Sequence, residues 1–156
     1  MADTVHSGGC QCGAIRFQAH GDEFASSICH CRMCQKQTGG YFGAFATFPD
    51  NKVVWTRGEV SYFVSSTIAK RGYCKDCGTP LTYEWHGDGV SLAIGSFDDP
   101  NKVPPNKQLD FSARIQSFDD LHKLPKRDEA ADFAQQQASL KNFQHPDHDT
   151  KSWPEE

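Results

Sequence analysis

The sequence has no apolar run that approaches the roughly 20 residues of a membrane-spanning helix. It also has no internal repeat of fixed period and no low-complexity block, so its 156 residues suit one folded domain with a modest core. An excess of basic residues is missing as well: the net charge is −4 and the pI is near 5.9, which argues against a general nucleic-acid-binding protein. The N-terminal residues MADTVHSGGC lack the charged start and apolar run of a signal peptide, and we therefore expect a cytoplasmic protein.

Hydrophobic residues are arranged in the pattern of β-strands. They make up 37% of the chain, which contains 11 Phe, 3 Trp and 4 Tyr, and this is typical of a folded protein. Within residues 8–20, apolar residues alternate at Ile15, Phe17 and Ala19, which is the period of a strand. Similar patterns predict strands within residues 41–49, 52–66, 73–85, 91–97 and 109–118, with HGDGV as a hairpin turn. The sequence thus predicts a single, mainly β domain.

The last part of the chain has a different composition. From about Asp128, the stretch DEAADFAQQQASLKNF is rich in helix-forming residues and predicts a short C-terminal helix. The end, QHPDHDTKSWPEE, is charged and interrupted by proline, so we expect a loose tail there. We attribute the spacing of His145 and His148 in this tail to chance rather than to metal binding.

Cysteine is the residue that this sequence has in unusual number: seven, in three groups. The groups are Cys10-x-Cys12, Cys29-x-Cys31-x-x-Cys34 and Cys74-x-x-Cys77. In a reducing compartment, clustered cysteines bind metal or perform redox chemistry more often than they form structural disulfides. A two-residue gap followed by glycine, as in CKDCGTP, is the zinc-knuckle arrangement, in which the turn aims both sulfurs at one ion.

The three groups can be divided between two zinc ions without a remainder. The first and last groups are pairs, and together they close a four-thiolate site, which has no free position and is structural. The middle triplet leaves one position open, as catalytic zinc sites do. An incoming thiol would bind there as a thiolate, and beside an aldehyde it would be set up to form or break a carbon–sulfur bond. The pattern predicts thiol chemistry on zinc without naming the thiol.

Spacing alone leaves other assignments of the cysteines open. One alternative is a single zinc ion with three free cysteines. Another is a site that joins Cys29 and Cys31 to Cys74 and Cys77. Disulfides are disfavoured by the absence of a signal peptide. A redox dithiol at Cys74 and Cys77 is disfavoured because a thioredoxin-like motif would open a helix in a βαβ unit, whereas the surroundings here are strands.

Three motifs, GGCQCGAIRF, CHCRMCQKQTGG and CKDCGTPL, occur in this order within residues 8–118. Together they resemble the glutathione-dependent formaldehyde-activating enzyme family, to which centromere protein V is also similar. The resemblance implies a zinc-binding, catalytic β-tent domain in residues 1–127, a fold shared with methionine-R-sulfoxide reductases, with residues 128–156 as a helical extension and tail of the same domain. It implies a zinc-dependent carbon–sulfur lyase that joins formaldehyde and glutathione, or a related thiol and aldehyde, into S-hydroxymethylglutathione or its counterpart. Arg114 stands where members of the family often have a histidine.

The resemblance also assigns the cysteines, with two zinc ions per chain. The structural zinc would be held by Cys10, Cys12, Cys74 and Cys77, and the catalytic zinc by Cys29, Cys31 and Cys34. We expect a small-molecule thiol and an aldehyde as partners, with neither nucleic acid nor a membrane. Two other functions stay open: a non-catalytic carrier that binds glutathione at the triplet, and a zinc-stapled module that binds a protein partner.

Charged residues and one histidine flank the cysteines. His30 lies between two of them and would point away from the metal in an extended chain, so we expect it beside the site or in solvent rather than as a ligand. Five cations lie near cysteines in the sequence: Arg32, Lys36, Lys70, Arg71 and Lys75. We expect each to be solvated and to offset part of the thiolate charge. The functional interpretation is docking of an anionic thiol such as glutathione.

Overall fold

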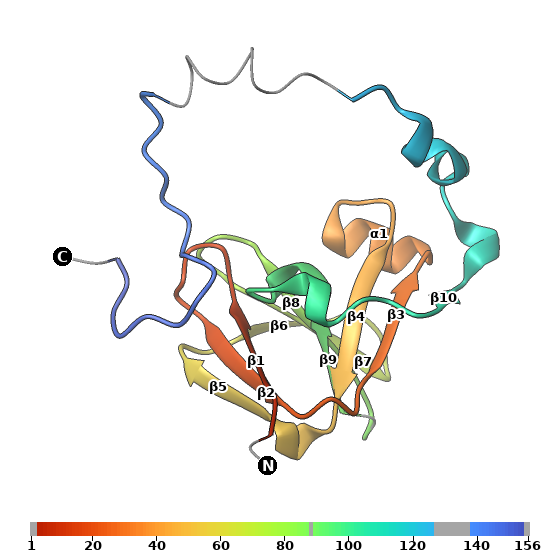
Figure 1. The fold of residues 1–156 in the computed structure, drawn as a ribbon. Coiled ribbons are helices and arrows are strands. Elements are labelled where there is room, and N and C mark those ends of the chain that lie inside the picture. Colours follow the sequence, from red (N-terminus) through yellow and green to blue (C-terminus); the bar gives the residue numbers. More distant parts are fainter. Residues whose placement is uncertain (1–2, 88, 127–137, 155–156) are drawn as a thin grey trace.

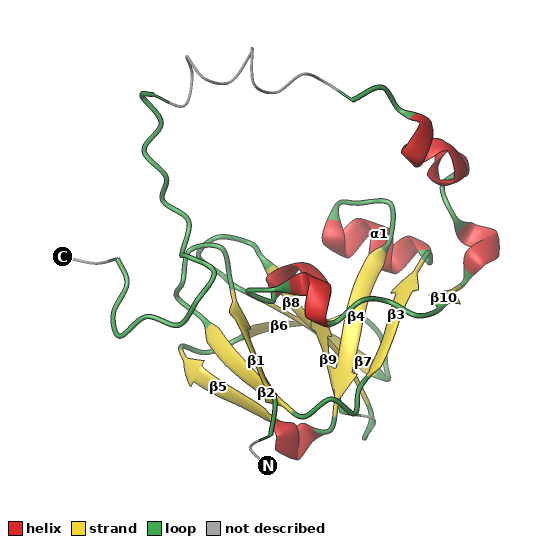
Figure 2. Cartoon of the chain, in the orientation of Figure 1, coloured by secondary structure: helices red, strands yellow, loops and turns green. Residues whose placement is uncertain are grey.

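The computed structural model describes residues 3–87, 89–126 and 138–154, and these residues fold mainly into β-strands (Figures 1 and 2). The strands are β1 (Val5–Gly9), β2 (Arg16–His20), β3 (Ala25–Cys29), β4 (Gly43–Phe48), β5 (Val53–Arg57), β6 (Ser61–Val64), β7 (Ala69–Tyr73), β8 (Pro80–Trp85), β9 (Val90–Ala93) and β10 (Gln108–Leu109). The helices are α1 (Arg32–Thr38) and the short 3-10 helices η1 (Asp50–Lys52), η2 (Ile94–Ser96), η3 (Pro100–Lys102), η4 (Phe111–Ala113) and η5 (Gln116–Lys123). Across the described ranges, every helix is too short or too polar to span a lipid bilayer.

The strands form two sheets. One has the order β1-β2-β5, and the other has the order β10-β3-β4-β9-β8-β7-β6. Neighbouring strands are antiparallel, except that the two-residue strand β10 runs parallel to β3. The predicted mainly β fold is confirmed.

A hydrophobic core lies between the two sheets. Phe17 and Ala19 point into it from β2, and Phe48 and Leu92 from β4 and β9; all four are fully buried. The Phe17 ring meets Phe97 edge-on, with 5.1 Å between the ring centroids. Burial of each large side chain stabilises the fold by about 1.5–3 kcal/mol. The alternation seen in the sequence therefore identifies the inward face of β2 correctly.

The strand predicted within residues 109–118 is wrong. Only its first residue belongs to β10, and the chain then turns into η4 and η5. Asp110 has a left-handed backbone, with φ of 51° and ψ of 41°, which ends the extended conformation. Beyond it, Phe111 and Phe118 both pack on the ring of His30, so their spacing serves an aromatic cluster rather than a strand face.

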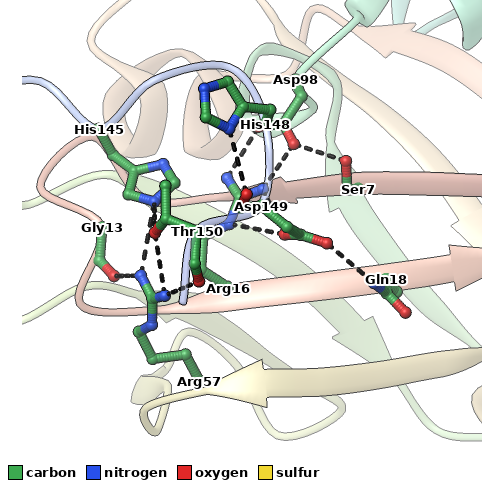
Figure 3. A network of polar contacts seen from close by, with 10 residues as sticks. All are labelled: Ser7, Gly13, Arg16, Gln18, Arg57, Asp98, His145, His148, Asp149 and Thr150. Atoms are coloured by element: carbon green, nitrogen blue, oxygen red, sulfur yellow. Dashed lines mark hydrogen bonds and ion pairs between the residues drawn. The ribbon is translucent and has the colours of Figure 1, made fainter. Parts of the chain in front are cut away.

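The C-terminal helix predicted from about residue 128 falls largely on residues 127–137, which lie outside the described residues. The structure does describe the segment that follows, and the expectation of a loose tail is wrong for it. Its carboxylate Asp149 accepts hydrogen bonds from Arg16 at 2.7 Å and from Gln18 at 2.8 Å, both on β2 (Figure 3). Arg16 is buried and also pairs with Asp98 at 2.5 Å, so two carboxylates balance its charge.

A second set of contacts holds the same segment beside the β1–β2 turn. The His145 N–H donates to the Gln11 carbonyl at 2.9 Å. Arg57, at the end of β5, donates to the carbonyls of Thr150 and Gly13, at 2.5 and 3.1 Å (Figure 3). Figure 1 shows this blue segment lying against the first sheet, far along the chain from the strands that hold it. An ion pair and several hydrogen bonds to distant residues, rather than local propensity, place the C-terminal segment.

The Asp149→Asn variant tests this docking. Burial raises the pKa of Asp149, but the Arg16 guanidinium and the Gln18 amide outweigh it and hold the pKa below its ordinary value. A lowered folded-state pKa gives a stabilisation that is fully present above the unfolded pKa of about 3.9 and is lost as the pH falls through the folded value. Because the side chain is 41% exposed, we expect the variant to lose only about 1 kcal/mol, equally at pH 6 and pH 8, in urea unfolding of the metal-loaded protein.

The matched control is Asp147→Asn, which makes the same change of charge in the same segment. Asp147 is exposed, and no hydrogen bond or ion pair joins it to another described residue. We expect its unfolding to match the wild type. Equal stability of the two variants would contradict the role assigned to Asp149.

Candidate metal centres

Four cysteine sulfurs meet where two turns approach each other. One turn joins β1 to β2, and the other joins β7 to β8. The residues are Cys10, Cys12, Cys74 and Cys77, and all four Sγ atoms lie within 4.8 Å of one another. The Cys10–Cys12 and Cys12–Cys74 sulfurs are 3.6 and 3.8 Å apart. Four sulfurs at about 2.3 Å from one zinc ion would be about 3.8 Å apart, so this donor set fits a tetrahedral ion.

Local backbone geometry sets the β7–β8 turn. Gly78 has a φ of 76°, a left-handed value that glycine adopts without strain, and its N–H donates to the Cys74 carbonyl at 2.8 Å. The glycine that follows the second cysteine in CKDCGTP thus closes the turn that aims both sulfurs at one point.

The pKa values of the cysteines in this cluster are shifted in different directions by their surroundings. Burial raises the pKa of Cys77, but the hydroxyl and N–H of Thr79 and the N–H of Cys12 outweigh it and lower the pKa to about 6. Burial raises the pKa of Cys12 to about 12. The Cys10 sulfur accepts a hydrogen bond from the Ile15 N–H at 3.2 Å. Donors to sulfur here are backbone amides and a hydroxyl, and no cationic side chain of the described chain is among them.

The other three cysteines form a second cluster at the start of α1. Cys29 is the last residue of β3, Cys31 is the N-cap of α1, and Cys34 lies in its first turn. Their Sγ atoms also lie within 4.8 Å of one another. The Cys31 sulfur accepts the Cys34 N–H at 3.4 Å, so the thiol itself caps the helix, and Gly39 ends the helix with a φ of 67°. Cys34 is buried, whereas Cys29 and Cys31 are half-buried.

Arg71, on β7, is the cation that contacts this cluster. Its two terminal nitrogens lie 3.7 and 3.6 Å from the Cys34 sulfur. Its Nη1 also donates to the Gln37 side-chain oxygen at 2.9 Å, and its guanidinium lies 4.8 Å from the centre of the Tyr83 ring. Burial raises the pKa of Cys34, and Arg71 opposes that rise. The pKa of Cys31 is lowered: burial raises it, but the Cys34 N–H and the neighbouring thiols outweigh burial.

The other four cations named in the sequence have different positions. Lys70 pairs with Glu84 at 3.0 Å, and Arg32 donates to Gln35 at 3.2 Å. Lys36 and Lys75 are both exposed. Arg71 is thus the one member of the five that contacts a cysteine sulfur in the described structure. The sequence places all five near cysteines equally and does not single it out.

His30 is completely buried and lies outside both clusters. Its Nε2 is hydrogen-bonded to the Gln108 side-chain oxygen at 2.8 Å, and its ring meets Phe118 edge-on at 4.7 Å. The His30 N–H donates to the Leu109 carbonyl at 3.0 Å. The expectation that it is not grouped with the metal ligands agrees with this position, but the solvent-facing alternative is wrong. Its contacts hold the β10 segment against β3, beside the three-cysteine cluster.

Asp110 is a site residue that the sequence does not indicate. Its carboxylate lies 3.3 Å from the Cys29 sulfur, 81 residues away in the chain, and its backbone is left-handed. Asp adopts the left-handed conformation more readily than most residues do, but no motif in the neighbouring sequence predicts it at residue 110. Arg114, four residues on, pairs with Asp119 at 2.7 Å and lies over the ring of Phe111, so its contacts are not with cysteines.

Comparison with known proteins agrees with this arrangement. The family model for the glutathione-dependent formaldehyde-activating enzyme matches residues 5–113, a span that contains all seven cysteines. The chain belongs to this family. An uncharacterized lyase of Schizosaccharomyces pombe is 34% identical over 80 residues, which are 51% of this chain and 58% of the relative. The match therefore spans little more than half the length of that relative.

The two clusters predict two independent metal ions per chain. Cys31→Ser should lower the metal bound per chain by one ion and leave the other in place. Cys77→Ser should lose the opposite ion, because no cysteine is shared, and should also lower the stability of the fold. Elemental analysis of the purified proteins measures the count. Cobalt spectra then show whether the ion that is lost differs between the two variants. Loss of the same ion in both would show that the seven cysteines are shared rather than divided.

Proposed function

We propose that the protein is a zinc-dependent carbon–sulfur lyase that joins glutathione, or a related thiol, to formaldehyde or a related aldehyde. The observation that carries the proposal is the difference between the two clusters: one gathers four sulfurs, the other only three. Donor sets made only of thiolates suit zinc, and a three-ligand zinc site with one open position is the arrangement of catalytic zinc. Membership in the glutathione-dependent formaldehyde-activating enzyme family and the lyase relative support the same activity.

The four-cysteine cluster would have a structural role. Its two cysteine pairs come from turns in different sheets, so an ion there would tie the β1–β2 turn to the β7–β8 turn. With four sulfurs, it has no position left for a substrate. Cys10 and Cys74 are buried in a small core with Ile15 and Leu81, which agrees with a role in folding rather than in binding substrate.

The three-cysteine cluster would have the catalytic role. Zinc held by Cys29, Cys31 and Cys34 would supply a position at which the substrate thiol binds without its proton. Cys29 and Cys31 are half-buried, whereas Cys34 is buried, so the aldehyde would approach from the side of Cys29 and Cys31. In the addition, the substrate sulfur forms a bond to the aldehyde carbon, the C=O π bond breaks, and a proton from solvent ends on the oxygen. Asp110 is the acidic side chain beside Cys29 and faces this reaction space.

Exchange NMR on a mixture of glutathione and formaldehyde tests the activity. Catalytic amounts of the zinc-loaded protein should speed formation and breakdown of the hydroxymethyl adduct. Cys31→Ser should abolish the acceleration while the fold remains, because the four-cysteine cluster is intact. Asp147→Asn, which changes an exposed carboxylate of the C-terminal segment, should keep the wild-type rate. Thiol binding without acceleration would replace the lyase with a thiol carrier, and absence of both would leave a binding module.

A further inference from the structure

Two arginines are buried in the described part of the chain, and their surroundings differ. Arg16 is 3% exposed and Arg71 is 4% exposed. Arg16 pairs with two carboxylates, those of Asp98 and Asp149. For Arg71, no carboxylate of the described chain lies within ion-pair distance. A buried charge without a counter-charge is strongly unfavourable, so the structure must supply an anion of another kind.

The groups around Arg71 identify that anion. Gln37 on α1 offers a neutral oxygen at 2.9 Å, and Tyr83 on β8 offers the face of its ring. The Arg71 Nε has no hydrogen-bond partner. What remains is the Cys34 sulfur, which both terminal nitrogens approach. The counter-charge of Arg71 is therefore the thiolate cluster itself.

The charges of the two clusters then differ in a way that bears on ligand binding. A divalent ion with four thiolates carries a net charge of −2 and accepts nothing further. With three thiolates the net charge is −1, and a substrate thiolate would raise it to −2. The Asp110 carboxylate, 3.3 Å from the Cys29 sulfur, makes each of these last two values more negative by one, and the guanidinium of Arg71 offsets that charge. Arg71 thus removes part of the electrostatic opposition to a fourth, anionic ligand, which is strongest where water is excluded.

We propose that Arg71 is a positioning residue that balances the charge of the three-cysteine centre and makes its open position favour a thiolate over water. Gln37 takes part by holding Nη1 from α1, the helix that also carries Cys34. The inference deepens the proposed function, since it assumes that a metal ion occupies this cluster. It also separates the two centres: among the described residues, a cationic side chain contacts the three-cysteine cluster, where a ligand would enter, and none contacts a sulfur of the four-cysteine cluster.

The test uses the full-length protein with cobalt in both sites, titrated with 2-mercaptoethanol. Binding of the thiol as a fourth thiolate changes the sulfur-to-cobalt charge-transfer and ligand-field bands of the three-cysteine centre. Arg71→Met, which keeps the length but loses the charge, should weaken thiol binding about 10-fold to 100-fold. Arg71→Lys should restore most of the affinity, because it keeps the charge. The bands of the four-cysteine centre should be the same in all three proteins.

Substitutions of Gln37 test the charge without removing the arginine. Gln37→Glu places a carboxylate at the 2.9 Å contact and so diverts the charge of Arg71 from the cluster. It should weaken thiol binding as Arg71→Met does, whereas the neutral control Gln37→Met should have a smaller effect. The Glu variant decides the question if Arg71→Met fails to fold or to bind cobalt at this centre. Wild-type thiol affinity in Gln37→Glu, with both cobalt ions bound, would overturn the proposal.

The outcome is separable from that of the lyase proposal. If glutathione and formaldehyde are not turned over but thiol affinity still depends on Arg71, the inference stands and the lyase falls. If the protein turns over glutathione and formaldehyde but its thiol affinity is the same whatever the charge at residues 37 and 71, the inference about Arg71 is wrong and the lyase proposal stands.

Discussion

The constraint on which the rest of the structure depends is the meeting of two cysteine turns that belong to different sheets. Cys10 and Cys12 leave the end of β1, and Cys74 and Cys77 lie between β7 and β8. Bringing these sulfurs within 4.8 Å fixes one end of the three-stranded sheet against the seven-stranded sheet. Where such a cluster holds a metal ion, the binding free energy is also folding free energy. The distance between the two sheets is then fixed at one end, and the aromatic core packs between them.

Two buried arginines, Arg16 and Arg71, have different counter-charges. Near the four-cysteine end, Arg16 is satisfied by carboxylates from two distant segments, and this pairing holds residues 145–150 in place. At the three-cysteine end, Arg71 faces sulfur instead. The role of a buried arginine thus depends on its counter-charge. Paired with Asp98 and Asp149, Arg16 joins parts of the fold; paired with thiolates, Arg71 would, as we propose, let the cluster take another anion.

Local patterns in the sequence account for much of this arrangement. Short spacings collect the seven cysteines into three groups, the family resemblance assigns these to a set of four and a set of three, and the inward face of β2 follows from alternation at Phe17 and Ala19. Contacts between distant residues are what the sequence could not supply. In the sequence, Arg71 cannot be distinguished from four other cations near cysteines, and only the fold shows that it is buried. Asp149 likewise cannot be distinguished from other acidic residues of the C-terminal segment, and only the fold shows its ion pair with Arg16. The sequence does not predict helix α1, because its N-cap is a thiol, Cys31, rather than a usual capping residue.

The misassigned strand at residues 109–118 shows how the second site is shaped. A continuous strand would have carried this segment along the edge of β3 and away from the cysteines. Instead, the left-handed backbone at Asp110 turns the chain, and its carboxylate comes to 3.3 Å from Cys29. A left-handed non-glycine residue costs about 1 kcal/mol or more, so the surroundings must over-determine it. His30 provides that restraint, because its backbone, its Nε2 and the Phe118 ring hold both sides of the turn. The histidine between the cysteines therefore influences the site without contacting a sulfur, because it fixes the segment whose Asp110 carboxylate lies beside Cys29.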